Sequence, residues 1–270
     1  MRLLYCGDIV GRPGRAVVAQ HLPDLRRDLS LDLVVVCGEN AAHGFGITQK
    51  ICEFLYDLGV DVITTGNHVW DQREIIKYIS QDPRLLRPLN YIEGTPGRGC
   101  GVFETSSGQK VLVAQVICRL FMKEVDDPFH SLTKCFQEYG LGFDIDAAII
   151  DIHGEATSEK AALAHWCDGK ASLAVGSHSH VPTADARILG NGTAFQSDAG
   201  MCGVYDSVIG MKKEIAIRRF TSPDTPGLLE PAKGEPTLCG VYVETDDKTG
   251  LTLEVRPIRV GGDLIQTEPD

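Results

Sequence analysis

Short apolar runs alternate with longer amphipathic stretches along most of this chain of 270 residues. The runs are rich in β-branched residues, and most stop at a glycine or a polar residue. They cover residues 1–7, 33–37, 60–65, 111–117, 147–151 and 173–175. Runs of this kind are typical of buried parallel strands separated by helices. The pattern therefore predicts an α/β fold.

Helices are predicted between these strands, over residues 13–29, 48–58, 71–79, 128–139 and 157–166. Thr48 is a suitable N-cap for the second helix. Asp71 with Glu74 three residues later resembles a capping box for the third. Thr157 or Ser158 can cap the last one.

The pattern loosens at two places. Residues 83–108 are rich in glycine and proline and predict a connection followed by a hairpin. After His180, short segments predict antiparallel strands over residues 184–189, 193–196, 215–220, 240–244 and 252–260, and residues 222–236, with four prolines, predict an exposed loop. The sequence contains no repeat, low-complexity tract or evident linker, so we expect one domain over residues 1–270.

The charge balance restricts the class of ligand. The formal net charge is 26 − 37 = −11, and the sequence pI is about 5.2. An acidic surface repels the phosphate backbone, so a general binder of duplex nucleic acid is not expected. A small phosphorylated ligand remains compatible, because a bound metal ion reverses the field locally.

Nine cysteines, with no C-x-x-C and no regular spacing, suit free thiols in a reducing cytosol. The first strand begins too early for a signal peptide, and no apolar stretch is long enough to cross a bilayer. We therefore expect a soluble cytoplasmic protein without a membrane partner. Acidic α/β proteins of this size often self-associate, so a homo-oligomer is one expectation, although no stretch identifies an interface.

Residues of metal-ligand type stand where predicted strands end. They are Asp8, Glu39 with Asn40, Asn67 with His68, His153, and His178 with His180; Gly200-Met201 is a sixth candidate position. Ligands of open α/β sheets gather at the carboxyl ends of the strands. Side chains that are far apart in the sequence are therefore expected to meet at one metal site.

Taken singly, these residues have ordinary explanations. Asp8 suits a turn or a cap, and Asn67 after a glycine is common turn chemistry. A lone histidine is more often a surface or core residue than a ligand. His178 and His180 differ, because H-x-H on an extended segment directs both rings to one face. The joint pattern at separate strand ends favours the metal site.

Oxygen and nitrogen donors without a thiolate suit manganese, iron or zinc better than copper(I) or an iron–sulfur cluster. The candidates outnumber the ligands of one tetrahedral ion, which favours two ions sharing a carboxylate. A pair of ions about 3.5–4 Å apart is a standard device for hydrolysing phosphate esters.

The motifs resemble those of the calcineurin-like metallophosphoesterases, which read D-x-H, G-D-x-x-D, G-N-H-[DE], H and G-H-x-H along the chain. The closer resemblance is to the YmdB-like branch of that superfamily, and it covers almost the whole chain. It rests on GDIVGRPGR, CGENAAHGFGIT, TGNHVWD, DIHGEATSEK, GSHSHVPTAD and DAGMCGVYDSVIGM. The resemblance implies a four-layered α/β sandwich, in which two mixed sheets lie face to face and are flanked by helices.

The resemblance also implies roles for individual residues. One ion would be held by Asp8, Glu39, Asn40 and His180. Glu39 would bridge to a second ion held by Asn67, His153 and His178. His68 would be the general acid that protonates the leaving group. Apart from the resemblance, Trp70 and Asp71 are expected to support the position of His68 by packing and capping. The ions implied are iron or manganese, with zinc and magnesium as alternatives.

This sequence departs from the wider superfamily at two positions. Val10 stands where D-x-H places a ligand histidine, so the first ion loses an imidazole. Glu39 replaces the usual aspartate and is followed by Asn40, whose oxygen is a candidate replacement ligand. Both changes mark the YmdB-like branch. Within that branch, His43 and Gly154 stand where other small residues are expected, with no clear chemical consequence.

Contacts to substrate are predicted for Arg12, His43 and Thr157. Each also has a structural explanation without a ligand: a solvated arginine in a turn, a loop histidine, and a simple helix cap. Residues 200–205 are expected either to line the pocket or to form a glycine-rich turn. His21, His130 and His165 fall on predicted helices and are not expected to be ligands.

The function implied is a two-metal phosphodiesterase that hydrolyses small phosphodiesters, such as 2′,3′-cyclic and 3′,5′-cyclic nucleotides. One alternative is a phosphomonoesterase or nucleotidase that uses the same ions. Another is a regulatory protein that senses a nucleotide and hydrolyses it only incidentally.

Overall fold

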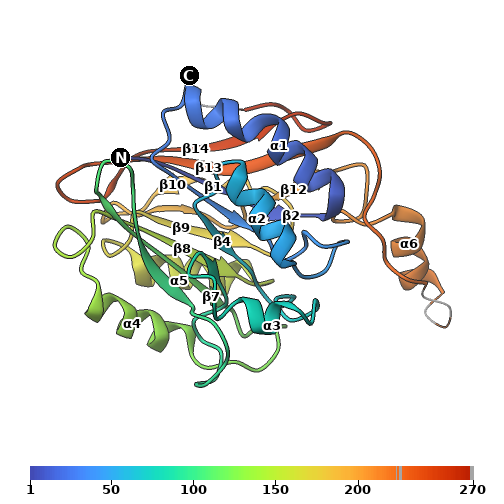
Figure 1. Ribbon diagram of the computed structural model, residues 1–270, viewed down its shortest axis with the longest axis horizontal. Helices are drawn as coiled ribbons and strands as arrows, with labels where there is room; N and C mark the ends of the chain where they lie inside the picture. Colours follow the sequence, from blue (N-terminus) through green and yellow to red (C-terminus); the bar gives the residue numbers. More distant parts are fainter. Residues whose placement is uncertain (223, 225–226, 268–270) are drawn as a thin grey trace.

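In the computed structural model, which describes residues 1–222, 224 and 227–267, two β-sheets pack face to face with helices on their outer sides (Figure 1). The eight-stranded sheet has the order β2-β12-β13-β1-β3-β4-β5, with β14 paired to β13, and the six-stranded sheet has the order β10-β11-β9-β8-β7-β6. This arrangement confirms the predicted α/β sandwich of two mixed sheets.

The strands of the first sheet are β1 (Arg2–Cys6), β2 (Asp8–Ile9), β3 (Leu33–Cys37), β4 (Val62–Thr64), β5 (Leu85–Leu86), β12 (Met201–Val204), β13 (Pro236–Thr245) and β14 (Thr252–Val260). Those of the second are β6 (Cys100–Glu104), β7 (Lys110–Ile117), β8 (Ala147–His153), β9 (Leu173–Ser177), β10 (Arg187–Ile188) and β11 (Ala194–Gln196). The helices are α1 (Gly11–Asp28), α2 (Gln49–Asp57), α3 (Ile75–Tyr78), α4 (Pro128–Glu138), α5 (Thr157–Cys167) and α6 (Lys213–Thr221).

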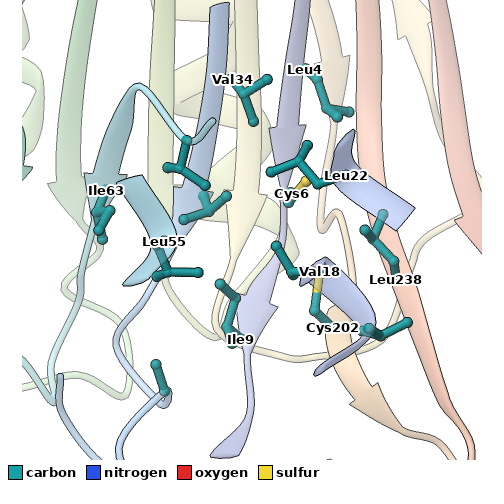
Figure 2. Close-up of a cluster of buried hydrophobic side chains, with 14 of the residues drawn as sticks. Leu4, Cys6, Ile9, Val18, Leu22, Val34, Leu55, Ile63, Cys202 and Leu238 are labelled. Carbon is teal, nitrogen blue, oxygen red and sulfur yellow. The ribbon is translucent and has the colours of Figure 1, made fainter. Parts of the chain in front are cut away.

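Alternation along β1 shows how the layers form. Leu3 and Tyr5 point into a buried cluster shared with β7, β8 and β9 of the other sheet. Leu4 and Cys6 point the opposite way, into a cluster with α1 and α2; Figure 2 shows Leu4 and Cys6 with Leu22 and other members of that cluster. Successive strand residues face opposite sides, so an all-apolar strand is buried on both.

The second sheet repeats this arrangement. Val111, Val113 and Ile149 face the first sheet, while Ile150 and Leu112 face a third cluster that contains Leu132 of α4 and Leu163 of α5. Two helical layers therefore enclose two sheets, which confirms the four-layered arrangement.

Parallel pairing brings strand ends to one edge. In the first sheet, β1, β3, β4 and β5 are parallel neighbours. In the second, β7, β8, β9 and β11 are parallel neighbours. The segments that leave the carboxyl ends of β1, β3, β4, β8 and β9 carry the predicted ligands, so the topology places them where the two sheets meet.

Most predicted helices are present. Thr48 caps α2 and accepts a hydrogen bond from the Ile51 amide at 3.4 Å. α4 begins at Pro128, where the side chain of Asp127 accepts hydrogen bonds from the first-turn amides. The hairpin expected in residues 83–108 is completed by β6 and β7, which pair antiparallel.

Three local predictions are wrong, and a fourth holds only in part. Residues 71–79 form only the single turn α3, because the Asp71 carboxylate contacts the His68 ring instead of capping a helix. Thr157 does not cap α5; Ala156 holds that position without a side-chain bond. Residues 215–220 lie in α6, not in a strand. A short apolar run fits the helical period of about 3.6 residues as well as the two-residue period of a strand. β11 runs parallel to β9, although it pairs antiparallel with β10.

The strands expected over residues 240–244 and 252–260 are confirmed as β13 and β14, which pair antiparallel. The predicted loop at residues 222–236 lies partly outside the described residues. Within the described part of the chain, no helix combines the length and apolar character that a bilayer span requires.

The cysteines are free thiols, and all except the half-buried Cys100 are buried. Burial raises the pKa values of Cys118, Cys167 and Cys239 to about 12. A hydrogen bond with Cys135 lowers the pKa of Cys100. Thiolates, not thiols, react with disulfide reagents.

We therefore expect Cys100 alone to react quickly with dithiobis(nitrobenzoic acid) at pH 8 in the folded protein. All nine cysteines should react once the chain is unfolded in guanidinium without a reductant. Fewer than nine reactive thiols after unfolding would reveal a disulfide and contradict the structure.

Candidate metal centre

The structure brings the predicted ligands together from both sheets. Asp8 lies in β2, His153 ends β8, and the others follow strand ends: Glu39 and Asn40 after β3, Asn67 after β4, His178 and His180 after β9. Ligand-type atoms lie within 4.8 Å of one another in three overlapping groups, which are Asp8-Glu39-His180, Glu39-His153-His178 and Asp8-Cys37-His153.

Glu39 is shared by two of these groups. Its Oε2 lies 3.3 Å from His153 Nε2, and that nitrogen lies 3.0 Å from Asn67 Oδ1. On the other side, His180 Nε2 lies 3.9 Å from Asp8 Oδ1. The carboxylate of Glu39 therefore stands between an Asp8-His180 half and an Asn67-His153-His178 half, the position that a bridging ligand requires.

Asn40 leaves a buried oxygen without a partner. Its Nδ2 donates to Gly44 O at 3.1 Å, but its Oδ1 makes no hydrogen bond within the described structure. Buried polar atoms are almost always satisfied, so an orphaned oxygen at this place needs an explanation. A metal ion held beside Asp8 and Glu39 would supply the missing partner, and the donor set therefore fits the implied ions.

The tautomer of His153 follows from its neighbours. Ser177 Oγ donates its one proton to Asp151 Oδ1 at 2.6 Å. It must therefore accept from His153 Nδ1, 2.8 Å away. Nδ1 carries the hydrogen, and in the neutral ring Nε2 presents a lone pair toward Glu39 and Asn67. Such outer partners commonly orient metal-binding histidines.

His180 is oriented in the same way. Its Nδ1 lies 2.8 Å from the carbonyl oxygen of Ile209, which can only accept. Its Nε2 is therefore the nitrogen that faces Asp8. His153, at the end of β8, and His180, in the loop after β9, therefore both direct Nε2 toward the centre.

The H-x-H segment is not extended, contrary to the sequence expectation. His178 and His180 have φ values of 95° and 66° in a bend beyond β9. This left-handed region is costly for residues other than glycine, and such strain persists only where surrounding contacts hold it. The rings therefore converge through the bend, not through strand alternation.

A buried ion pair holds that bend. Lys160 Nζ lies 2.8 Å from Asp198 Oδ2, and both side chains are about 1% exposed. The same oxygen accepts hydrogen bonds from the backbone amide and the hydroxyl of Ser179. Asp198 Oδ1 accepts from the Gly200 amide. Ser179, between the two histidines, is thereby fixed to the protein interior.

The charges around the centre favour a cation. Burial opposes ionisation of Glu39, but the charge of His153 outweighs it and lowers the Glu39 pKa to about 2. Burial also opposes charge on His153, yet Glu39, Asp8 and Asp151 raise its pKa to about 9. The carboxylates thus stabilise positive charge at this point, whether a proton or a metal ion supplies it.

His178 and Asp8 show the effect of burial. Burial and then the charge of His153 lower the pKa of His178 to about 3, so its ring is neutral at physiological pH. Burial raises the pKa of Asp8 to about 6, against the charges of His180 and His153. A neutral imidazole is the form that binds a metal.

Cys37 also reaches the centre, although sequence reasoning treated it only as a small apolar residue. Its Sγ lies 3.3 Å from Asp8 Oδ1 and 3.2 Å from Thr65 O, both within reach of the thiol hydrogen. Burial, followed by the charge of Asp8, raises its pKa well above the usual value. The Cys37 thiol therefore contacts Asp8, and its sulfur is a further ligand-type atom at the centre.

Gly66 allows the backbone before Asn67 to pass close to the side chains of Glu39 and His153. A β-carbon at this position would lie 2.2 Å from Glu39 Oε2 and 2.5 Å from His153 Nε2. The chain before Asn67 can therefore pass beside both side chains only as glycine.

His68 lies at the edge of the centre and is 29% exposed. Its amide donates to Glu39 Oε2 at 3.1 Å, and its Nδ1 lies 2.7 Å from Asp71 Oδ2. Phe45 meets its ring edge-on at 5.1 Å. The expected support from Asp71 is present, whereas Trp70 packs near Tyr91, with ring centroids 6.3 Å apart.

The predicted substrate contacts stand apart from this cluster. Arg12 and His43 are exposed, and Thr157 is the exposed first residue of α5. Within the described residues, no hydrogen bond or ion pair links their side chains to a predicted ligand. His21, His130 and His165 lie on α1, α4 and α5, as expected.

The sixth candidate position, Gly200-Met201, supports Asp8 through the backbone. Gly200 O accepts from the Asp8 amide at 3.2 Å, and Met201 pairs with Asp8 in register. The Met201 side chain packs with Val10 and Met211. Apolar packing therefore occupies the place where Val10 replaces a histidine.

Besides Cys37, four supporting residues were not identified as site residues from the sequence: Asp151, Ser177, Lys160 and Asp198. Asp151 precedes His153 by two residues and Ser177 precedes His178 by one, so proximity to the motifs was a usable signal. The sequence contains no comparable signal for the Lys160–Asp198 pair, since a lysine on a helix is normally solvated.

The fold and the donor set are those expected of a metallophosphoesterase. A family model described as YmdB-like protein matches residues 4–258. A Bacillus subtilis (strain 168) protein named 2′,3′-cyclic-nucleotide 2′-phosphodiesterase is 42% identical over 263 residues, which are 97% of this chain and 98% of that protein. The chain therefore belongs to the YmdB-like family.

Solved structures agree. A hypothetical protein from Thermus thermophilus superposes with a TM-score of 0.90 at 38% identity, covering 97% of this chain and 100% of the other. A Mycoplasma pneumoniae protein described as a novel phosphatase gives a TM-score of 0.89 at 34% identity, covering 97% and 94%.

Replacing Ser177 tests the orientation of His153. In Ser177→Ala, Nδ1 loses its acceptor and the ring loses its fixed tautomer, so metal affinity should fall about 10- to 100-fold. Chelator competition measures this affinity. Ser107→Ala, at a surface turn, should behave as the wild type. An unchanged affinity in Ser177→Ala would show that the Asp151–Ser177–His153 chain does not act on a metal.

Proposed function

We propose that this protein is a metal-dependent phosphodiesterase that hydrolyses small phosphodiesters, with 2′,3′-cyclic and 3′,5′-cyclic nucleotides as the first candidates. One observation carries the proposal: His153 and His180 both present Nε2 to a cluster in which Glu39 is shared and Asn40 Oδ1 has no partner. The name of the Bacillus subtilis relative supports a cyclic nucleotide as the substrate.

In this proposal, Asp8, Glu39, Asn40 and His180 hold one ion, and Glu39, Asn67, His153 and His178 hold the other. When bound, the pair supplies positive charge for the phosphoryl group and makes water more acidic. Donors limited to oxygen and nitrogen favour iron or manganese, with zinc and magnesium as alternatives.

His68 is the proposed general acid. Asp71 accepts from Nδ1 and stabilises the positive charge of the protonated ring. Among the described residues none hydrogen-bonds Nε2, so that atom is available to donate a proton. The amide contact with Glu39 fixes His68 beside the centre. A proton from Nε2 to the departing oxygen would turn a poor alkoxide leaving group into an alcohol.

Arg12, His43 and Thr157 remain proposed outer contacts to the substrate. Arg12 and Thr157 lie in the first turns of α1 and α5, and His43 lies in the turn that follows Asn40. These positions are compatible with contacts to a ligand larger than a phosphate group.

Removing the ions tests the metal requirement. Dialysis against a strong chelator should abolish hydrolysis of a cyclic nucleotide, and manganese or iron(II) should restore it. The melting temperature should fall on removal and recover on addition, since a bound ligand stabilises the folded state. Full activity in protein shown by elemental analysis to lack metal would contradict the proposal.

Replacing His68 tests the acid role. His68→Ala should lose about 10²- to 10⁴-fold in kcat for a cyclic nucleotide, whose leaving group needs a proton. It should lose far less with bis-p-nitrophenyl phosphate, whose leaving group departs without one, and metal content should be unchanged. His130→Ala, on the outer face of α4, is the control. An equal loss on both esters would assign His68 a structural role.

The same assays separate the alternatives. A phosphomonoesterase would prefer p-nitrophenyl phosphate to the matching diester under identical metal loading. A nucleotide sensor would bind the cyclic nucleotide, and replacing His68 would not change its slow hydrolysis.

A further inference from the structure

A cleft of about 980 Å³ opens between the loops that follow β5 and β7, and both loops are hydrogen-bonded to backbone that carries predicted ligands. Ile92, in the loop that follows β5, forms one side. Residues 119–120 and 122–129, which follow β7, form the other, together with Glu159 of α5. None of these residues is a predicted ligand or predicted substrate contact, so the cleft lies outside the centre described above.

Both sides of the cleft are tied to the backbone that carries the ligands. Ile117 pairs with His153 in register, and the Cys118 amide donates to His153 O at 2.8 Å. Tyr91 OH donates to Gly66 O at 3.2 Å, one residue before Asn67. The cleft therefore begins one residue beyond Tyr91 on one side and one residue beyond Cys118 on the other.

Asn90 holds the two sides at a fixed separation. Its Nδ2 donates to Ile117 O and Asp126 O, both at 2.9 Å. Its Oδ1 accepts from the Ile117 amide at 2.8 Å, and its carbonyl accepts from the Asp126 amide at 2.9 Å. The side chain is buried and fully bonded, so the cleft is preformed and does not depend on a rearrangement.

The walls expose large apolar side chains beside charged ones. Ile92 is 68% exposed and Leu120 is 50% exposed. Met122 and Val125 add partly buried apolar surface. Large apolar side chains that line a preformed cleft beside polar groups are typical of a ligand site.

The charged residues of the cleft disfavour a second phosphate. Arg119 and Lys123 stand against Glu124, Asp126, Asp127 and Glu159, a formal balance of 2 − 4 = −2. Glu159 accepts from the amides of Arg119 and Leu120, both at 2.9 Å. An uncharged group suits this cleft better than another anion.

We propose that the cleft binds the nucleoside part of the substrate, with the base between Ile92 and Leu120. The inference rests on the proposed function, since the phosphodiester would then lie at the metal centre while the uncharged base and sugar extend into the cleft. An excess of acidic groups would also select a single cyclic nucleotide over an oligonucleotide, whose further phosphates are repelled.

The test compares two cyclic diesters, one with a base and one without. Leu120→Ala and Ile92→Ala should each lower kcat/KM for adenosine 2′,3′-cyclic phosphate about tenfold, mainly through KM. The same variants should change kcat/KM for glycerol 1,2-cyclic phosphate less than about twofold. Leu253→Ala, at an exposed position of β14, should change neither value.

Equal losses on both diesters, or no loss on either, would overturn the cleft assignment and leave the proposed function standing. Binding of adenosine, which carries no phosphate, tests the cleft independently of hydrolysis. Saturation-transfer NMR should show that wild-type protein binds adenosine and that Leu120→Ala binds it about tenfold more weakly. A wild type that binds adenosine in this way but hydrolyses no diester would overturn the proposed function and support the cleft.

Discussion

The buried carboxylate of Asp151 is the contact on which the rest of the site depends. It accepts hydrogen bonds from Tyr5 at 2.8 Å and Thr64 at 2.6 Å, both in the first sheet. It also accepts from Gln115 at 2.7 Å and Ser177 at 2.6 Å, both in the second. A hydrogen bond to a charged group contributes about 1.5–3 kcal/mol, and an unsatisfied buried charge costs more. Asp151 therefore fixes the position of one sheet relative to the other at the edge where the ligands meet. Ser177, which donates to Asp151, also contacts the His153 ring and so fixes the orientation of that ring.

Rigidity around the centre comes from buried polar groups that bind no ligand themselves. The Lys160–Asp198 pair holds the left-handed bend of His178 and His180, and Asn90 holds the walls of the cleft. A buried ion pair adds little net stability, because desolvation offsets its attraction. Its evident effect here is geometric: it keeps strained histidines in place before any ligand arrives, which is what a preorganised site needs.

Much of the fold was predictable because its signals are local. Apolar runs predicted the central strands of both sheets, and Thr48 and Pro128 marked the starts of α2 and α4 correctly. The prediction of a strand at residues 215–220 was wrong, because Ile215 and Ile217 fit a strand as well as a helix and only Ala216 of α6 is buried. The prediction that Asp71 caps a helix was wrong for a different reason. Its carboxylate contacts the His68 side chain and so was not available as a cap.

The sequence by itself determined which chemistry is present: oxygen and nitrogen donors at separate strand ends, without a ligand histidine at Val10. Parallel strands deliver their ends to one edge, so the meeting of these residues followed from the pattern. Only the tertiary structure decided which atoms face inward. The orientation of the His153 ring depends on Ser177, and the contacts of the Cys37 thiol depend on Asp8 and Thr65, all remote in the sequence. That the Asn40 oxygen is buried without a partner is likewise visible only in the folded chain. Contacts between residues remote in the sequence leave no local periodicity, so these details required the folded chain.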